Sequence, residues 1–113
     1  MRTETITSAQ NSKIKMLLAL GEKSRTRREN SLFVVEGRKE IGHCLDAGYK
    51  VRTLFACPEI IPERELKKIA ERCGEDCTIV NVPAHLYEKI AYRGSTEGVR
   101  AEAEIIDKSL GDI

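Results

Sequence analysis

Apolar residues at helical spacing mark four segments of the chain. The segments, each given with its apolar residues, are 12–21 (Ile14, Leu17, Leu18), 38–47 (Ile41, Cys44, Leu45), 62–73 (Leu66, Ile69, Ala70, Cys73) and 83–91 (Leu86, Ile90, Ala91). Spacing of three and four residues places each set on one face of a helix, so the pattern predicts four amphipathic helices. Asn11 or Ser12 can cap the first helix, which Gly21 ends or kinks, whereas Gly48 and Gly74 end the second and third.

Four other segments have the composition and pattern of β-strands. Residues 32–35 (LFVV) form a short apolar run that is typical of a strand covered on both faces, and residues 51–57 and 78–82 follow as two more strands. Residues 99–105 (VRAEAEI) alternate strictly between apolar and charged side chains. This alternation predicts a strand with one solvent-exposed face, near an edge of the sheet.

The order of these elements is one helix followed by strands that alternate with helices. Parallel strands need crossover connections, which helices provide, so the order predicts an α/β fold: a three-layer α/β/α sandwich with a mostly parallel four-stranded sheet. With 113 residues, of which 41% are hydrophobic, the chain has the size of one domain. We assign the domain to residues 1–105, and residues 106–113, which lose the periodicity, to the start of a linker.

The sequence contains no run of about 20 apolar residues that could span a membrane, and no apolar core of a secretory signal near its start. We therefore expect a cytoplasmic protein without a membrane partner, in which the four cysteines are reduced (Cys44, Cys57, Cys73 and Cys77). Cys73 and Cys77 supply only half of the ligands of a structural zinc ion. Burial as small apolar residues is the favoured interpretation, and no metal is expected.

Positive charge is concentrated in the first quarter of the chain. Residues 1–28 hold seven Lys or Arg against two Glu, a net charge of +5, which leaves −4 for the remaining residues. This asymmetry indicates either a surface that faces a polyanion or a solvated helix face. Arginine engages phosphate oxygens through paired hydrogen bonds, which favours a nucleic acid, while the scarcity of aromatic residues argues against base stacking. Residues 22–29 either extend the first helix or form an exposed loop, a cationic arm anchored by the strand that follows.

Two further segments have both a functional and a structural interpretation. Glu36 lies at the carboxyl end of a predicted strand, where ligands of α/β proteins bind, but no second acid or base accompanies it. A structural salt bridge to Arg38 or Lys39 is therefore favoured over catalysis. Residues 91–100 (AYRGSTEGVR) form a polar turn, either a plain connector or a loop that brings Arg93 to a bound partner. Sequence motifs for a serine nucleophile, a nucleotide phosphate or a dinucleotide are missing, so no catalytic residue is assigned.

The order of these features resembles that of one known RNA-binding module. The features are the segment ITSAQNSKIKMLLAL (6–20), the segment SRTRRENSLFVVEG (24–37) with Phe33, Val35, Glu36 and Gly37 in an F-x-V-E-G strand end, and a late turn with Ser95, Thr96, Gly98 and Val99. Together they resemble the N-terminal substrate-binding domain of SpoU (TrmH-type) RNA 2'-O-methyltransferases over residues 6–105. Thr96 and Glu97 stand where that family commonly has Pro and Gln.

The resemblance implies a ribosomal-protein-like α/β/α sandwich that presents rRNA or tRNA to a separate catalytic domain. That second domain would bind S-adenosylmethionine, methylate a ribose 2'-hydroxyl and form homodimers. Its motifs have no counterpart in these 113 residues, so we expect neither enzymatic activity nor a cofactor in this chain. The residues expected to contact RNA are Asn11, Lys13, Lys15, Lys23, Arg25, Arg27, Arg28, Arg38, Arg93, Ser95 and Thr96.

Two other functions stay open on the sequence alone. A stand-alone RNA-binding protein of the same fold would have no catalytic domain encoded after residue 113. A protein-interaction module whose acidic part docks a basic partner would not be retained on a phosphate-bearing resin, and it leaves the clustered arginines without a role.

Overall fold

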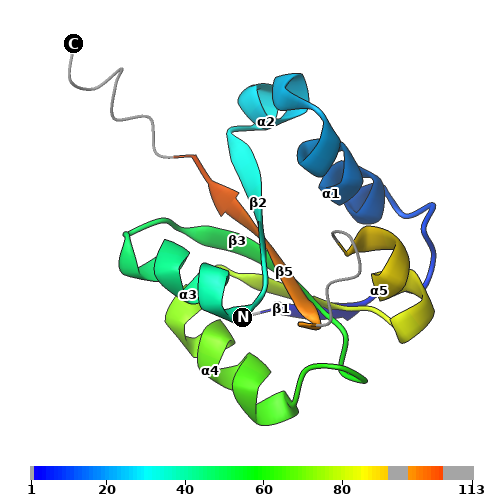
Figure 1. Ribbon diagram of the computed structural model, residues 1–113, viewed down its shortest axis with the longest axis vertical. Helices are drawn as coiled ribbons and strands as arrows, with labels where there is room; N and C mark the ends of the chain where they lie inside the picture. The colour runs from blue at the N-terminus through cyan, green and yellow to red at the C-terminus, as the bar shows by residue number, and fades with distance from the viewer. Residues whose placement is uncertain (1, 92–96, 106–113) are drawn as a thin grey trace.

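A computed structural model describes residues 2–91 and 97–105, which form a sheet with helices on both faces (Figure 1). In chain order the elements are β1 (Arg2–Thr5), α1 (Ser12–Glu22), α2 (Ser24–Asn30), β2 (Leu32–Glu36), α3 (Arg38–Asp46), β3 (Val51–Ala56), α4 (Glu63–Cys73), β4 (Thr78–Asn81), α5 (Ala84–Ile90) and β5 (Val99–Glu104). The four helices predicted from the periodicity are confirmed as α1, α3, α4 and α5. The four predicted strands are confirmed as β2 to β5.

The sheet has five strands rather than four, in the order β1-β4-β3-β5-β2. The additional strand, β1, has the sequence RTET, so hydrophobic patterning could not reveal it. Its backbone pairs in parallel with β4 at the edge of the sheet, and three of its four residues are exposed. An edge strand can be this polar because the hydrogen bonds of the ladder, not burial, hold it.

The sheet is mixed, and the prediction of a mostly parallel sheet is wrong. β1, β4 and β3 run parallel, but β5 is antiparallel to both of its neighbours, β3 and β2. The helix between β4 and β5 suggested a parallel crossover. Instead, β5 begins at the same end of the sheet where β4 stops, since Asn81 and Val99 both pair with Ala56, and a helix count cannot reveal this.

β5 also lies inside the sheet rather than near its edge, and neither of its faces is open to solvent. Val99, Ala101 and Ala103 belong to the hydrophobic cluster with α3 and α4, whereas Arg100 and Glu102 point to the other face and are each only 7% exposed. The alternation indicated two different faces, but not that α1 and α5 cover the charged one. The edge position belongs to β2, which is half-buried instead of covered on both faces.

Two hydrophobic clusters, one on each face of the sheet, hold the helices in place. On one face α3 and α4 pack through Ile41 and Ala70 against strand residues such as Leu54. On the other, α1 packs through Ile14 against Phe55, together with apolar residues of α5. The free cysteines lie in or against the same clusters, as expected for small apolar residues (Cys44, Cys57, Cys73 and Cys77).

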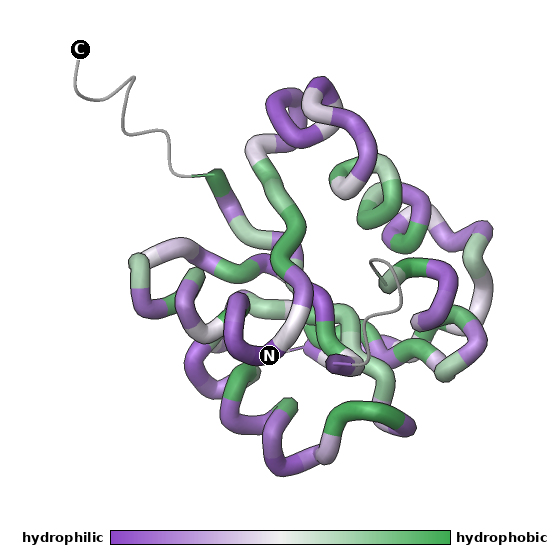
Figure 2. Tube along the Cα trace, viewed as in Figure 1, coloured by the Kyte–Doolittle hydropathy of each residue, from purple (hydrophilic) through white to green (hydrophobic). Residues whose placement is uncertain are grey.

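Residues 22–29 form neither a loop nor a continuation of the first helix, so the predicted cationic arm is wrong. α1 passes Gly21 and ends at Glu22, and a separate helix, α2, begins at Ser24 after Lys23 in extended conformation. Figure 2 shows α2 as hydrophilic around its circumference, and none of its residues is buried. Among the described residues, no helix is both long and apolar enough to cross a membrane.

Candidate nucleic-acid interface

The first two predicted RNA contacts, Asn11 and Lys13, take part in interactions at the start of α1. The side-chain oxygen of Asn11 accepts a hydrogen bond from the backbone nitrogen of Lys13 at 2.8 Å, which makes Asn11 the N-cap of the helix. The Nζ atom of Lys13 lies 2.6 Å from Oε2 of Glu4 on β1. This bond lowers the pKa of the Glu4 carboxyl below its usual value. Both side chains therefore connect α1 to its surroundings before any ligand is present.

The predicted cations on α1 and α2 differ in how far they are engaged. Nη1 of Arg27 donates to the carbonyl oxygen of Leu20 at 2.7 Å, and this bond fastens α2 to the last turn of α1. Nε of Arg25 lies 3.4 Å from Oε2 of Glu29 one turn along α2, and both side chains are largely exposed. Such an exposed pair contributes little and opens readily.

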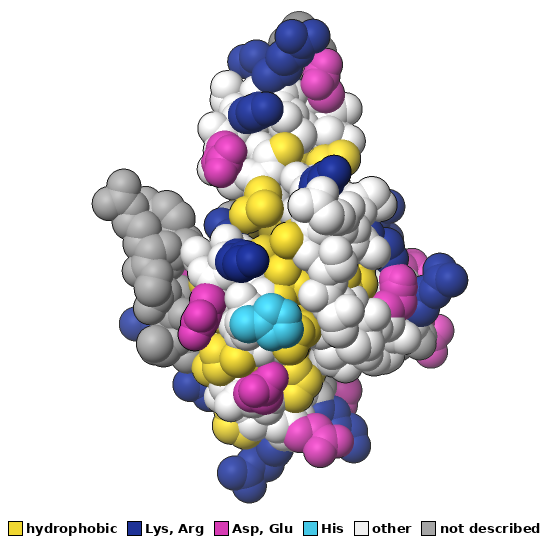
Figure 3. Space-filling model, turned by 90° about the vertical axis from the view of Figure 1, so that its right-hand side faces the viewer, with side chains coloured by type: hydrophobic (Ala, Val, Ile, Leu, Met, Phe, Trp, Pro, Cys, Tyr) yellow, Lys and Arg dark blue, Asp and Glu magenta, His cyan; other side chains and the backbone are white. Residues whose placement is uncertain are grey.

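The remaining predicted cations are exposed, and no ion pair among the described residues involves them (Lys15, Lys23 and Arg28). Figure 3 shows Lys and Arg side chains gathered at the end of the molecule formed by α2. We call Lys15, Lys23, Arg25 and Arg28 the basic patch. Its charges face solvent on α1, on α2 and at the junction between them, which is an arrangement suited to phosphate groups.

Arg38 lies away from the basic patch, at the start of α3. Its backbone nitrogen donates to Oε1 of Glu97 at 3.1 Å, and its Nε lies 3.7 Å from the same oxygen. The preceding Gly37 has a φ of +94°, and its nitrogen donates to the carbonyl oxygen of Val99 at 3.0 Å. Glu97, where the resembling family commonly has Gln, thus holds the turn that follows β2. The other three predicted contacts lie outside the described residues (Arg93, Ser95 and Thr96).

A buried ionic network, which the sequence did not reveal, lies between the sheet and the α1–α5 layer. Glu36 on β2 and Arg100 on β5 are direct cross-strand partners, and Nε of Arg100 lies 3.3 Å from Oε1 of Glu36. The hydroxyl of Tyr87 on α5 donates to Oε2 of Glu36 at 2.7 Å. The predicted salt bridge of Glu36 to Arg38 or Lys39 is wrong in its partner, since the facing strand supplies the cation.

Glu102 is the second buried charge on this face of the sheet. Burial raises the pKa of its carboxyl to about 7, and the opposing effects of a hydrogen bond with Thr53 and of the charges of Arg52 and Lys13 are smaller. Within the described part of the chain, its Oε2 has no hydrogen-bond partner. A shallow hollow beside it is lined by Lys13 and Met16 of α1. Glu102 therefore titrates near neutral pH within the layer that supports α1.

Gly98 fixes the entry to β5. Its φ is +80°, and a Cβ atom at this position would lie 2.7 Å from the backbone nitrogen of Ile61. Its carbonyl oxygen accepts a hydrogen bond from the nitrogen of Cys57 at 2.8 Å. Glycine is required here both for the left-handed conformation and for the close approach of the two backbones.

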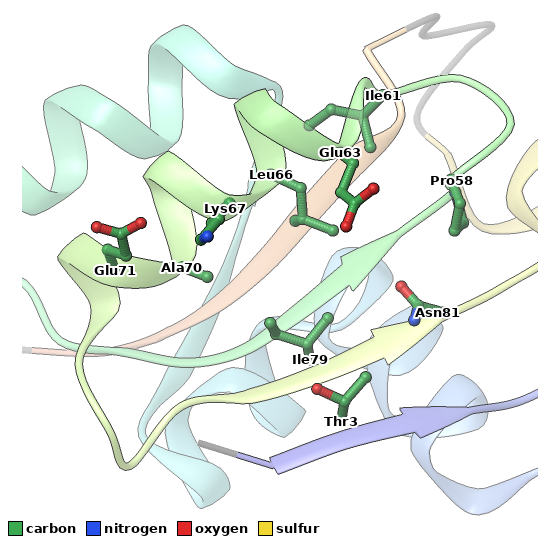
Figure 4. A pocket seen from close by; sticks show the side chains of 10 residues that line it. All are labelled: Thr3, Pro58, Ile61, Glu63, Leu66, Lys67, Ala70, Glu71, Ile79 and Asn81. Carbon is green, nitrogen blue, oxygen red and sulfur yellow. The ribbon is translucent and has the colours of Figure 1, made fainter.

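An apolar hollow lies on the opposite face, between α4 and the β1–β4 edge (Figure 4). It measures about 570 Å³, and apolar side chains such as Ile61, Leu66 and Ile79 line most of it. Within residues 2–91 and 97–105, no three His, Cys, Asp or Glu side chains come together as a metal site would require. The basic patch thus lies away from this apolar hollow, at the end of the molecule formed by α2.

Residues 11–101 match the sequence profile of the family described as the MRM3-like substrate binding domain. The chain belongs to this family. The matched range contains α1, the basic patch, the Glu36–Arg100 pair and the Gly98 turn, so the MRM3-like domain includes every feature described above except β1 and the end of β5. No functionally curated protein shows significant similarity to the chain.

Solved structures share the fold of this MRM3-like domain at low sequence identity. An rRNA methyltransferase from Sinorhizobium meliloti with bound AdoMet has a TM-score of 0.79 and 24% identity over 98% of this chain. The SpoU methyltransferase AviRb from Streptomyces viridochromogenes, in complex with the cofactor AdoMet, has a TM-score of 0.75 and 17% identity over 90% of this chain. The matched parts are 40% and 38% of those two proteins. The 113 residues thus correspond to well under half of either enzyme.

Proposed function

We propose that this chain recognises rRNA or tRNA on behalf of an S-adenosylmethionine-dependent ribose 2'-O-methyltransferase and performs no methyl transfer itself. The observation that carries the proposal is the basic patch, four exposed cations on α1, on α2 and at the junction between them, in a domain that belongs to a substrate-binding family. Residues 1–105 would form the recognition domain and residues 106–113 the start of a linker. The catalytic domain would supply the cofactor site and the homodimer interface, in the cytoplasm.

In this proposal the predicted contacts have two different roles. The basic patch meets the RNA backbone, while Asn11, Lys13 and Arg27 fix the two helices that carry it. Arg38 adds a charge beyond the patch, and Arg93, Ser95 and Thr96, from the segment before β5, would add further polar contacts. Recognition of this kind reads the backbone and shape of a structured RNA rather than stacked bases.

The test is the affinity for a labelled RNA hairpin, measured by fluorescence anisotropy across a series of salt concentrations. Because about five phosphates would be neutralised, log affinity should fall with log salt at a slope between roughly −3 and −5. Changing Lys15, Arg25 and Arg28 together to Ala should weaken binding by at least about tenfold and make the slope shallower by about 2.

The matched control removes three exposed cations from α4, on the opposite face of the sheet (Arg64, Lys67 and Lys68). The two triple variants have the same net charge, so their comparison separates a defined site from general attraction between a cation and RNA. Equal losses in both variants, or an affinity of the wild-type chain that does not depend on salt, would refute the proposal.

A further inference from the structure

The side chain of Arg100 lies at the base of a hollow between the last turns of α1 and α5. The hollow measures about 240 Å³, with Gly21 and Glu22 of α1 on one side and Lys89 and Ile90 of α5 on the other. Figure 1 shows α1 and α5 as neighbours on the same face of the sheet. Since the Arg100 side chain is only 9% exposed, its charge is held in one place.

The three edges of the Arg100 guanidinium have different surroundings. Nη1 donates to the carbonyl oxygen of Ile90. Nε faces Glu36 but makes no hydrogen bond of acceptable geometry. Nη2 points to α1, where a Cβ atom at Gly21 would lie 3.4 Å from it. The third edge therefore meets α1 at a residue that has no side chain, beside the open space.

The ends of two helices would by themselves repel an anion from this hollow, because their carbonyl groups carry partial negative charge. Here arginine side chains cap those carbonyl groups. Arg27 donates to Leu20 at the end of α1, and Arg100 donates to Ile90 at the end of α5. The caps offset the repulsion and add positive charge on both sides of the space.

The other charges around the hollow are Lys89 and Glu22 at its rim and Glu36 behind Arg100. Glu36 also receives the hydroxyl of Tyr87, so it is not available to Arg100 alone. Lys89 and Glu22 are exposed and can move apart. The Nη2 edge of the buried Arg100 and the adjacent exposed Lys89 together form a donor set that matches the oxygens of a phosphate group.

We propose that this hollow seats one phosphate of the bound RNA backbone, with Arg100 as the fixed donor and Lys89 as the second. This inference rests on the proposed function and deepens it. The hollow adjoins the basic patch, since α2 begins two residues after Glu22. It also adjoins the end of α5, which precedes Arg93 in the sequence. One RNA strand passing from α2 to the end of α5 would place a phosphate over Arg100.

The experiment fills the hollow instead of removing its arginine, because loss of a buried arginine could unfold the domain. Gly21→Leu places a side chain beside Nη2 of Arg100, and leucine in place of a helical glycine favours the helix. The expected result is an unchanged or raised melting temperature with an RNA affinity about tenfold lower. Lys89→Ala, at an exposed position, should weaken binding about threefold and make the salt slope shallower by about 1.

The matched control is Gly42→Leu in α3, where a Cβ atom would lie 3.7 Å from Nη1 of Arg72 on the other side of the sheet. It should leave the affinity for the same RNA hairpin unchanged. If Gly21→Leu and Lys89→Ala both bind like the wild type, the phosphate seat is wrong while the proposed function stands. If Gly21→Leu lowers the melting temperature, Lys89→Ala alone decides. If the wild type itself does not bind the hairpin at low salt, both proposals fail.

Discussion

The two faces of the sheet differ in the kinds of side chain that they bury. The face under α3 and α4 is apolar, with residues such as Leu54, Ala101 and Ala103 fully buried. The face under α1 and α5 holds an apolar cluster too, but Arg100 and Glu102 of β5 are buried within the same layer. Neighbouring residues of a single strand thus take part in two unlike cores.

The difference between the two faces suggests that one contributes mainly to stability and that the other supports the proposed RNA-binding surface. An apolar face gains stability from burial alone, and its contacts do not depend on pH or salt. The charged face includes buried ionic groups, which often cost as much in desolvation as they return in attraction. In this domain that face supports α1 and α2, the helices that carry the basic patch, so its charges lie under the surface proposed to bind RNA.

The largest expected effect comes from the apolar face. Leu54→Ala, at a fully buried position, should lower the free energy of unfolding by about 4 kcal/mol, because it removes apolar contacts and leaves a cavity. The loss should be the same at pH 5 and pH 8 when measured by urea denaturation. RNA affinity at a temperature where the variant is folded should equal that of the wild type. A loss that varied with pH would mean that the two faces are not independent.

A smaller effect is expected from the charged face, where Glu102→Gln should reduce the loss of unfolding free energy that the wild type shows as pH rises. The folded-state pKa of Glu102, about 7, lies above the ordinary value of 4.5, so the folded state retains a proton that the unfolded chain loses. Its contribution to stability is therefore present at low pH and lost as pH rises towards 7. Between pH 5 and pH 8 the wild type should lose about 2 kcal/mol more than Glu102→Gln.

Glu104→Gln on the same strand is the matched control for this titration. Glu104 is less buried and lies 3.1 Å from Nη1 of Arg52, in an exposed pair. Its substitution should leave the pH dependence between 5 and 8 like that of the wild type. Identical pH profiles of wild type and Glu102→Gln would show that Glu102 titrates normally and that the charged face is more hydrated than the structure indicates.

The smallest expected effect concerns one hydrogen bond of the ionic network. Tyr87→Phe removes the hydroxyl that donates to Glu36 and should cost about 1 kcal/mol, since the acceptor keeps Arg100 as a partner. Thermal unfolding at pH 7 measures it. A loss above about 3 kcal/mol would mean that Tyr87, and not Arg100, is the main support of the Glu36 carboxylate.

Most of the local structure could be predicted because its signals lie within a few residues of one another. The stripe of Leu66, Ile69 and Ala70 marks α4, and Asn11 was correctly among the expected caps of α1. Strand β1 could not be found in this way, since RTET is held by backbone pairing to β4 and buries almost nothing.

The position of β5 and the network around Arg100 depend on contacts between residues far apart in the chain. Charged residues that alternate along a strand predict a face exposed to solvent. Here α1 and α5, which are distant or separate elements in the sequence, cover that face. The basic patch was predicted well because a local excess of charge survives folding. The sequence could not show that Arg27, unlike the exposed cations, fastens α2 to α1. Its hydrogen-bond acceptor, the carbonyl of Leu20, is seven residues away.

The late arrival of β5 in the chain has a consequence for biosynthesis. In the described part of the sheet, β2 has β5 as its strand neighbour, and 62 residues separate the two elements in the sequence. At translation rates of roughly 5 to 20 residues per second, several seconds pass between the synthesis of β2 and that of β5. Throughout this time the cationic helix α2 is attached to an unpaired strand, because Glu36 can meet Arg100 only after β5 has been synthesised.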